Sequence, residues 1–495
     1  MPAAPALDPR TPVLVGAGQY SQRVDELGAA LDPVSMMAEA ARLAAGDAGL
    51  AGMPTPDSVR VVSLLSWRYG DPAAVLADML GVTSRQTAVT TMGGNSPQSL
   101  VNATAADIAA GRLDIALLAG GEASRTRQRA RKAGVEPDWP RAPESRQPDV
   151  IGHELEMSHP VEQRHGIYMP VQVYPMFETA IRAASGATPA QHLDRISRLW
   201  SRFSQVAESN PHAWSRTPRT AAEIATPTAS NRMIGLPYTK YMNSNNDVDM
   251  AAALVMCSAG TAEALGVPRD RWVFPHSGTD CHEHDAISER WSFAETPAIA
   301  LGGRRALDLA GLGVDDIDLV DLYSCFPAAV QLGAQSLGLS VESQLTRTGG
   351  LPFAGGPWNN YVMHAIATVM HELRDGAGTA ALVWANGGFA TKHAFGVYRT
   401  TPPASGFRHE SPQAQIDALP RRPFTDDHDG AAVIEAYTVM HDRDGRPVTS
   451  LAACLTDEGH RVWATSTQPD TAEAMCTGEW VGHRVRRAAD GTLHL

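Results

Sequence analysis

Two titratable side chains, Tyr323 and Cys325, stand one residue apart where a short apolar run ends. A phenol and a thiol at the end of a core strand can exchange a proton with a bound substrate, so they are the candidate catalytic pair. Each also has a structural explanation, the phenol as a buried group with a satisfied hydrogen bond and the thiol as a small core hydrophobe. The sequence alone leaves both explanations open.

The turn at residues 93–96 is the second feature that could do chemistry. Gly93 and Gly94 follow a predicted strand, and Pro97 stands at the first position of a predicted helix that Ser96 would cap. Backbone N–H groups at a helix N-terminus stabilise a negatively charged oxygen. The turn therefore suits an oxyanion or an enolate.

These residues need a rigid frame, and the sequence predicts one of the α/β layered class. Short apolar runs alternate with alanine-rich helical stretches over most of the 495 residues. A helix, a buried strand and a Gly-Gly turn follow one another twice, at residues 100–122 and 362–389, as expected of a duplicated unit. We predict strands at residues 11–15, 60–66, 87–92, 115–119, 249–256 and 318–322, and helices at 33–48, 73–80, 97–110 and 296–310.

Three segments interrupt or follow this pattern. Residues 125–232 are rich in Arg, Pro, Trp and His and are predicted to form a large inserted lobe. Residues 402–429 lack periodicity and are predicted to be a linker. Residues 430–495 have the order strand-strand-strand-helix-strand-strand, which is typical of a small five-stranded β-barrel of the OB type.

Two further motifs are given less weight. Residues 13–18 resemble the start of a dinucleotide fingerprint, but Ser21 replaces the third glycine, so we expect a tight turn after the first strand. Residues 276–285 are dense in metal-binding residue types but match none of the standard zinc spacings. We therefore predict no metal site.

Composition and charge limit the classes of partner and the cellular compartment that we expect for this protein. The net charge of −13 argues against a nucleic-acid partner, because binding to phosphates needs a basic face. Five cysteines with irregular spacing argue against a disulfide framework and for a reducing, cytoplasmic location. Neither a basic leader followed by an apolar run nor a stretch of about 20 apolar residues occurs, so we expect no signal peptide and no membrane span.

Three stretches resemble the thiolase superfamily, above all the sterol-carrier-type thiolases and the actinobacterial thiolase-like proteins that bear the name acetyl-CoA acetyltransferase. They are NRMIGLPYTKYMNSNNDVDMAAALVM (231–256), VDLYSCFPAA (320–329) and TGGLPFAGGPWNN (348–360). The resemblance implies a duplicated, five-layered thiolase fold of two βαβαβαββ halves, residues 10–265 with the inserted lobe and residues 266–401. It also implies that an acyl-CoA binds under the lobe.

The chain departs from this family at the residues that do its chemistry. The family's nucleophilic cysteine falls on Gly94, and the histidine of its Gly-His-Pro motif falls on Gly356. The third loop keeps the cysteine of the sterol-carrier form as Cys325, whereas Tyr323 replaces a polar residue. Ordinary thiolysis and Claisen condensation are therefore not expected. The resemblance implies that the following loop residues bind the oxyanion and the acyl-CoA: Gly94, Asn95, Ser96, Gly355, Gly356, Asn386, Gly387 and Gly388.

Three functions stay open on these residues. The first is an acyl-CoA-binding protein of lipid metabolism, nominally an acetyl-CoA C-acyltransferase, with altered or lost chemistry. The second is a retro-aldol carbon–carbon lyase that acts on a β-hydroxyacyl-CoA through Tyr323, since lyases of this superfamily place tyrosine in the third loop and work with a partner domain of the OB type. The third is a non-catalytic acyl-CoA or lipid carrier.

All three functions need the same partner, a small acyl-CoA molecule. Coenzyme A enters as substrate or ligand, and no further cofactor or metal is expected. Neither nucleic acid nor a membrane is an expected partner. A monomer and a homodimer both stay open, because a tail domain could cover the surface through which thiolases associate.

Overall fold

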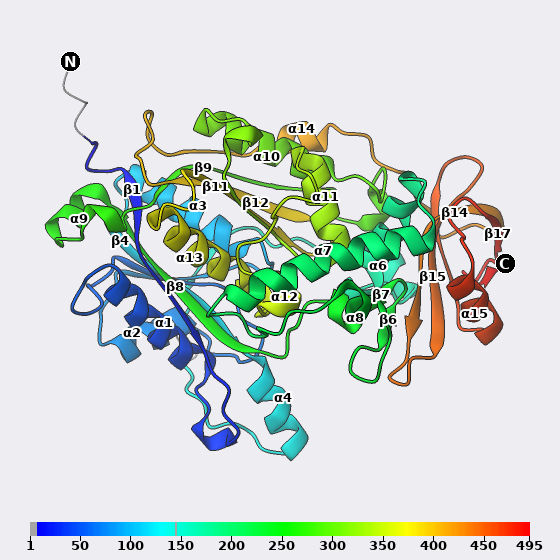
Figure 1. The fold of residues 1–495 in the computed structure, drawn as a ribbon, viewed down its shortest axis with the longest axis horizontal. Helices are drawn as coiled ribbons and strands as arrows, with labels where there is room; N and C mark the ends of the chain where they lie inside the picture. Colours follow the sequence, from blue (N-terminus) through cyan, green and yellow to red (C-terminus); the bar gives the residue numbers. More distant parts are fainter. Residues whose placement is uncertain (1–6, 144–145) are drawn as a thin grey trace.

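Two β-sheets form the frame of the molecule in the computed structural model, which describes residues 7–143 and 146–495 (Figure 1). The first sheet has the strand order β1-β8-β4-β2-β3-β5, and the second has the order β10-β11-β12-β9-β13. The strands of the first are β1 (Pro12–Ser21), β8 (Asp249–Ser258), β4 (Ile115–Ala123), β2 (Ser58–Val61), β3 (Gln86–Thr90) and β5 (Asp149–Ile151). Those of the second are β10 (Leu319–Leu322), β11 (Ala380–Gly387), β12 (Lys392–Arg399), β9 (Phe274–His282) and β13 (Arg408–Glu410).

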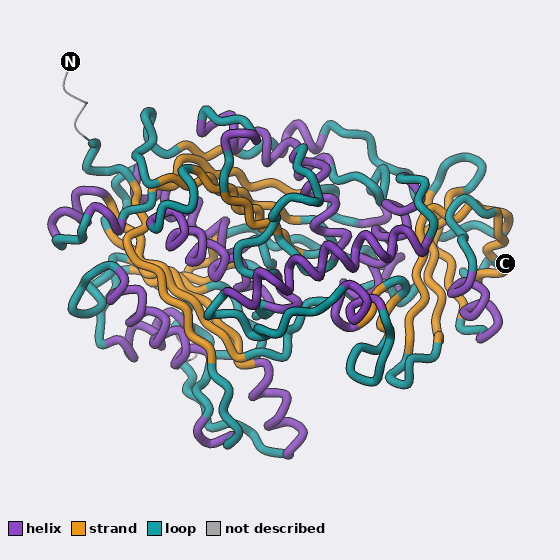
Figure 2. Tube along the Cα trace, viewed as in Figure 1, coloured by secondary structure: helices purple, strands orange, loops and turns teal. Residues whose placement is uncertain are grey.

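Helices cover both sheets and fill the space between them (Figure 2). The helices α3 (Ser96–Ala109) and α13 (Tyr361–Arg374) contact each other and strands of both sheets. On the outer faces, α1 (Pro33–Asp47) and α2 (Pro72–Leu80) pack on the first sheet, and α10 (Pro297–Ala310) and α11 (Pro327–Leu337) lie on the second sheet's side. The five layers and the repeated helix-strand units, α3 with β4 and α13 with β11, confirm the predicted α/β class and duplication.

The glycines near the N-terminus have a role that the sequence analysis did not predict. Gly16 and Gly18 lie inside β1, not in a tight turn after it, so that prediction is wrong. A Cβ on either glycine would overlap a backbone carbonyl oxygen of α1, at Ala44 or Ala40. The glycines therefore let α1 pack directly on the strand.

The inserted lobe is mostly helical. Its longest helices are α6 (Pro170–Ala184) and α7 (Pro189–Ser209), and α7 begins with a capping box at Thr188 and Gln191. The arginine-rich run at its entry forms the helix α4 (Ser124–Ala133). The remaining elements are α5 (Pro160–Arg164), α8 (Ala221–Ala225), β6 (Met233–Gly235) and β7 (Tyr238–Thr239).

The C-terminal region forms a third sheet at the end of the molecule opposite the N-terminus (Figure 1). Its strand order is β16-β15-β14-β17-β18, β6 of the lobe also pairs with β14, and a parallel bridge joins Thr465 to Thr492. The elements are β14 (Gly430–His441), β15 (Pro447–Leu455), β16 (Arg461–Ser466), α15 (Pro469–Thr477), β17 (Arg484–Arg487) and β18 (Leu493–His494). The predicted order of elements is thus present.

The segment predicted as a linker contains two regular elements. Its strand β13 runs parallel to β9 and extends the second sheet, and the short helix α14 (Gln413–Asp417) follows. Gln413 accepts a hydrogen bond from the His282 amide at 2.8 Å. The segment is therefore attached to the body of the molecule. No helix in residues 7–143 and 146–495 is long and apolar enough to cross a membrane.

The C-terminal sheet shares a hydrophobic core with the rest of the molecule. Trp463 of β16 is 1% exposed and belongs to the same buried cluster as the core residues of the second sheet. Its indole donates to the Ser288 hydroxyl at 2.9 Å, and Arg461 donates to the Ser288 carbonyl at 2.8 Å. On α6, the Thr179 hydroxyl donates to the Tyr437 carbonyl of β14 at 2.9 Å. These contacts argue against a tail that folds by itself.

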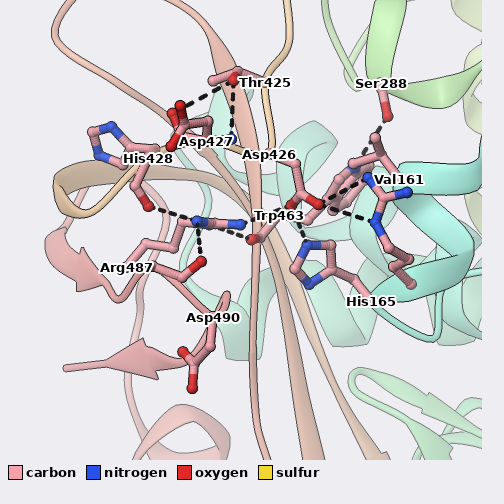
Figure 3. Close-up of polar contacts among 12 residues, drawn as sticks. Val161, His165, Ser288, Thr425, Asp426, Asp427, His428, Trp463, Arg487 and Asp490 are labelled. Carbon is pink, nitrogen blue, oxygen red and sulfur yellow. Dashed lines mark hydrogen bonds and ion pairs between the residues drawn. The ribbon is translucent and has the colours of Figure 1, made fainter.

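One carboxylate ties the C-terminal sheet to the lobe (Figure 3). Asp426 accepts hydrogen bonds from His165 at 2.7 Å, Arg164 at 2.9 Å and Arg487 at 2.8 Å, and Arg487 is 1% exposed. Burial alone would raise the pKa of Asp426, but the bonds from His165 and Arg164 outweigh burial and lower it. The charged form of Asp426 is therefore stabilised in the folded protein.

We expect Asp426→Asn to lower the free energy of unfolding by about 1.5–3 kcal/mol, because it leaves the buried Arg487 without its carboxylate. Since the pKa of Asp426 is lowered on folding, its contribution is present above the usual aspartate pKa of about 3.9 and is lost as the pH falls through the lowered value. Urea denaturation at pH 7 and at pH 3 measures both effects. Asp457→Asn, which breaks an exposed pair with Arg484, is the matched control. Equal loss in the two variants at pH 7 would contradict the role of Asp426.

Candidate functional site

A cavity of about 280 Å³ lies where strands of both sheets end. Six residues from the predicted site line it: Gly94, Tyr323, Cys325, Asn386, Gly387 and Gly388. Gly94 comes from the loop after β3, Tyr323 and Cys325 from the loop after β10, and the other three from the end of β11 and the turn after it. The fold therefore brings together, from positions nearly 300 residues apart in the sequence, the candidate catalytic pair and two of the glycine loops.

The Tyr323 hydroxyl occupies the space next to the backbone of Gly94. A Cβ placed on Gly94 would overlap the Tyr323 hydroxyl oxygen and lie 2.5 Å from the Asn386 carbonyl oxygen. The Tyr323 ring packs edge-on against Tyr361 with centroids 5.7 Å apart, which fixes its direction. Within the described ranges no hydrogen bond of its hydroxyl is found, and the residue lines the cavity. The phenol is therefore available to a ligand.

The second member of the pair, Cys325, is the one cysteine among the residues that line this cavity. Burial raises the pKa of its thiol to about 12, although a hydrogen bond with the Tyr174 hydroxyl acts in the opposite direction. Burial also raises the pKa of Tyr323, and the neighbouring Cys325 raises it by a smaller amount. At neutral pH both groups are protonated, so they can donate hydrogen bonds and protons but are weak bases.

Tyr174 of α6 is a site residue that the sequence analysis missed. Its hydroxyl accepts hydrogen bonds from the Asn386 side chain and the Ala390 amide, each at 2.9 Å, and donates to the Gly388 carbonyl at 3.1 Å. Its ring stacks on Phe326 with centroids 4.5 Å apart. One lobe residue thus holds the turn after β11 against the loop after β10.

Two backbone amides in the cavity lack acceptors. Neither the Gly94 amide at the start of α3 nor the Gly388 amide in the turn after β11 is hydrogen bonded within the part of the chain that the structure describes. The two loops adjoin, because a Cβ placed on Gly387 would lie 3.2 Å from the Gly94 nitrogen. Both glycines line the cavity, and free backbone amides are the kind of donor that an oxyanion or enolate oxygen requires.

Apolar side chains form the remaining wall and the mouth of the cavity. The lining includes Leu65, Met92, Met157, Met169, Val171 and Trp358. Leu65, Met169 and Trp358 are 47%, 43% and 38% exposed, which places them at the mouth. The cavity therefore has polar donors at its base and an apolar entrance, as ligand sites commonly do.

The other predicted loop residues lie elsewhere. Asn95 and Ser96 line a second cavity, of about 650 Å³, on the other side of the turn at residues 93–96. Ser96 donates to the Thr91 carbonyl at 2.8 Å and is the first residue of α3, so it is not the cap; Asn95 stands at the N-cap position without a side-chain capping hydrogen bond. Gly355 and Gly356 are not among the lining residues of either cavity, and the Gly356 amide donates to the Asn245 carbonyl at 2.9 Å.

The histidine-rich stretch near residue 280 has a structural role. Most of it is the strand β9, in which Asp280 accepts hydrogen bonds from Asn102 at 2.9 Å and His409 at 2.8 Å. Across residues 7–143 and 146–495, no three side chains of His, Cys, Asp or Glu are grouped so that they could hold a metal ion.

We expect Gly94→Cys to lower the free energy of unfolding by about 1–3 kcal/mol, because the new side chain must displace Tyr323. In a Tyr323→Ala background the overlap with the phenol is removed and only the close approach to the Asn386 carbonyl oxygen remains, so the cost falls and a double-mutant cycle gives a coupling energy of about 1 kcal/mol or more. Urea denaturation of the four proteins measures the cycle. Gly46→Cys is the control, since no atom lies within 4 Å of a Cβ there. Additive effects at positions 94 and 323 would show that the two residues do not compete for space.

Comparison with known proteins assigns the family. A crystal structure of a monomeric SCP2-thiolase like protein type 1 from Mycobacterium smegmatis matches with a TM-score of 0.83 and 33% identity, over 97% of each chain. The Ltp2-ChsH2(DUF35) aldolase (TM-score 0.60, 18% identity) and the dimeric peroxisomal thiolase of Saccharomyces cerevisiae (TM-score 0.56, 14% identity) each match over 79% of this chain and 98% of their own. The latter two likenesses concern the fold alone.

The C-terminal region is matched separately. Residues 412–492 match the model of the thiolase-like protein type 1 additional C-terminal domain, which begins inside the segment predicted as a linker. The comparison with curated proteins found no match. The chain belongs to the type 1 thiolase-like proteins of the thiolase superfamily, because it matches one such protein over 97% of its length and carries their additional C-terminal domain.

Proposed function

We propose that the protein binds an acyl-CoA with its thioester at the base of the 280 Å³ cavity and does not form an acyl-enzyme at position 94. The observation that carries this proposal is the Tyr323 hydroxyl, which fills the space that a side chain on Gly94 would need. The free amides of Gly94 and Gly388 supply donors for the thioester oxygen. Ordinary thiolysis has no nucleophile at this position, and the raised pKa of Cys325 makes its thiol a poor substitute.

A second candidate function is the retro-aldol cleavage of a β-hydroxyacyl-CoA. The protonated phenol of Tyr323 can act as a proton relay: as the bond to the β-carbon breaks, the β-hydroxyl group passes its proton to the phenol oxygen while the phenol's own proton goes to the α-carbon, so that the phenol ends protonated as it began. The bond between the α- and β-carbons breaks, and its electron pair passes through an enolate held by the two free amides. The products are a shortened acyl-CoA and an aldehyde or ketone. A similar fold occurs in an aldolase whose name includes a DUF35 partner, and here a C-terminal domain is part of the chain.

We expect the wild-type protein to bind acyl-CoA in isothermal titration calorimetry and to transfer no acyl group to CoA from 3-ketoacyl-CoA. With a panel of β-hydroxyacyl-CoA thioesters, release of an aldehyde or ketone identifies the lyase. Binding without turnover identifies a carrier. Absence of binding to every acyl-CoA tested would overturn the proposal.

If the lyase activity is found, Tyr323→Phe should lower its rate by about 10²–10⁴-fold, because the variant keeps the ring but loses the proton. The affinity for the acyl-CoA should stay within about twofold, since the phenol is not the main binding group. Tyr238→Phe is the control: Tyr238 is equally buried in the lobe but donates to Glu178, outside the cavity. An unchanged rate in Tyr323→Phe would exclude its role in catalysis.

A further inference from the structure

Trp358 stands at the mouth of the cavity in a backbone conformation that L side chains rarely adopt. Its φ is +46°, and Trp358 and Ala390 are the non-glycine residues with positive φ in the described parts of the chain. For a bulky side chain this region is sterically unfavourable and favours glycine. Full burial of the indole does not offset this unfavourable conformation, since Trp358 is 38% exposed. An exposed tryptophan in a strained conformation has no explanation in core packing.

The neighbouring residue fixes this conformation. Asn359 donates from its side chain to the Ser63 carbonyl at 2.8 Å and accepts from the Gly93 amide at 3.2 Å. The Trp358 amide itself donates to the Gly356 carbonyl at 2.7 Å. The Asn359 side chain therefore anchors the residue after Trp358 to Ser63 and to the loop that carries Gly94, and a local turn to Gly356 holds Trp358 itself, so the indole is presented at the cavity mouth.

The surfaces next to this indole are aliphatic and adaptable. Met92 and Met157 line the cavity together with Leu65 and Met169, and Met157 lies so close to the turn after β11 that a Cβ on Gly388 would overlap its sulfur. Methionine side chains adjust to apolar ligands of differing shape. An extended aliphatic chain fits this wall, whereas a two-carbon acyl group placed on the free amides of the base would not extend to it.

We infer that Trp358 is a ligand-binding residue and that, given the proposed function, the ligand is a thioester with an aliphatic acyl chain of medium or greater length. The chain lies against Trp358 and the methionines while the thioester oxygen is held by the amides at the base. Each methylene group that is removed from water adds to the affinity. Acetyl-CoA, whose acyl group has no such chain, is a weak ligand of this site.

Calorimetric titration with octanoyl-CoA, acetyl-CoA and free CoA tests the inference. We expect octanoyl-CoA to bind the wild-type protein at least tenfold more tightly than acetyl-CoA. Trp358→Gly should weaken octanoyl-CoA at least fivefold and change the binding of acetyl-CoA and CoA by less than twofold. Trp358→Phe should keep most of the preference for the longer chain. Trp291→Phe, at an exposed tryptophan outside this cavity, should leave all three affinities unchanged.

Thermal denaturation tests the stability of the same variant, which we expect not to fall even though its affinity for octanoyl-CoA does. Because glycine adopts a positive φ without strain, the Tm of Trp358→Gly should equal or exceed that of the wild-type protein. A lower Tm together with an unchanged chain-length preference would overturn the inference and make Trp358 a structural residue. Equal losses for octanoyl-CoA, acetyl-CoA and CoA would place the indole on the CoA moiety and would also overturn it. If no acyl-CoA binds the wild-type protein, the proposed function fails, whereas binding without a chain-length preference refutes this inference alone.

Discussion

The contact between the Tyr323 hydroxyl and the backbone of Gly94 determines what the site can do. Because the hydroxyl fills the space beside the start of α3, position 94 has no room for a side chain. The same contact leaves the Gly94 amide uncovered and directs an unpartnered phenol into the cavity. This one contact therefore determines the space at position 94, the free backbone donor and the position of the proton donor. All three favour a ligand that is held without a covalent bond.

The sequence predicted the frame better than the site. Strand β8 is an almost continuous apolar run from Met250 to Cys257, because it is covered on both faces, and such a run is recognisable in one sequence. Asn95 and Ser96 line the 650 Å³ cavity and not the cavity of Tyr323, because successive residues at a helix start point in different directions, which spacing in the sequence does not show. The sequence does not indicate Tyr174 as a site residue, because the lobe that carries it has no repeat and no motif. Only the tertiary structure places it beside Cys325.

Helix α6 connects the site with the C-terminal domain. Tyr174 near its start is bonded to the turn after β11, while Thr179 one and a half turns later is bonded to β14. Residues 402–429 were predicted to be a linker from their lack of periodicity, yet β13 pairs with the second sheet and the short helix α14 follows it. Aperiodic sequence excludes long regular elements, but it does not exclude short ones that depend on a partner for their order.

The position of Trp463 and Arg461 near the end of the chain has a consequence for biosynthesis. Both side chains complete the packing around Ser288, a residue made much earlier, and so the central core stays open while the ribosome is still translating. Exposed apolar surface in that interval is a hazard for a nascent chain. Premature stop codons or early release would therefore yield polypeptides that chaperones and proteases must clear, even when every residue of the ligand cavity has already been synthesised.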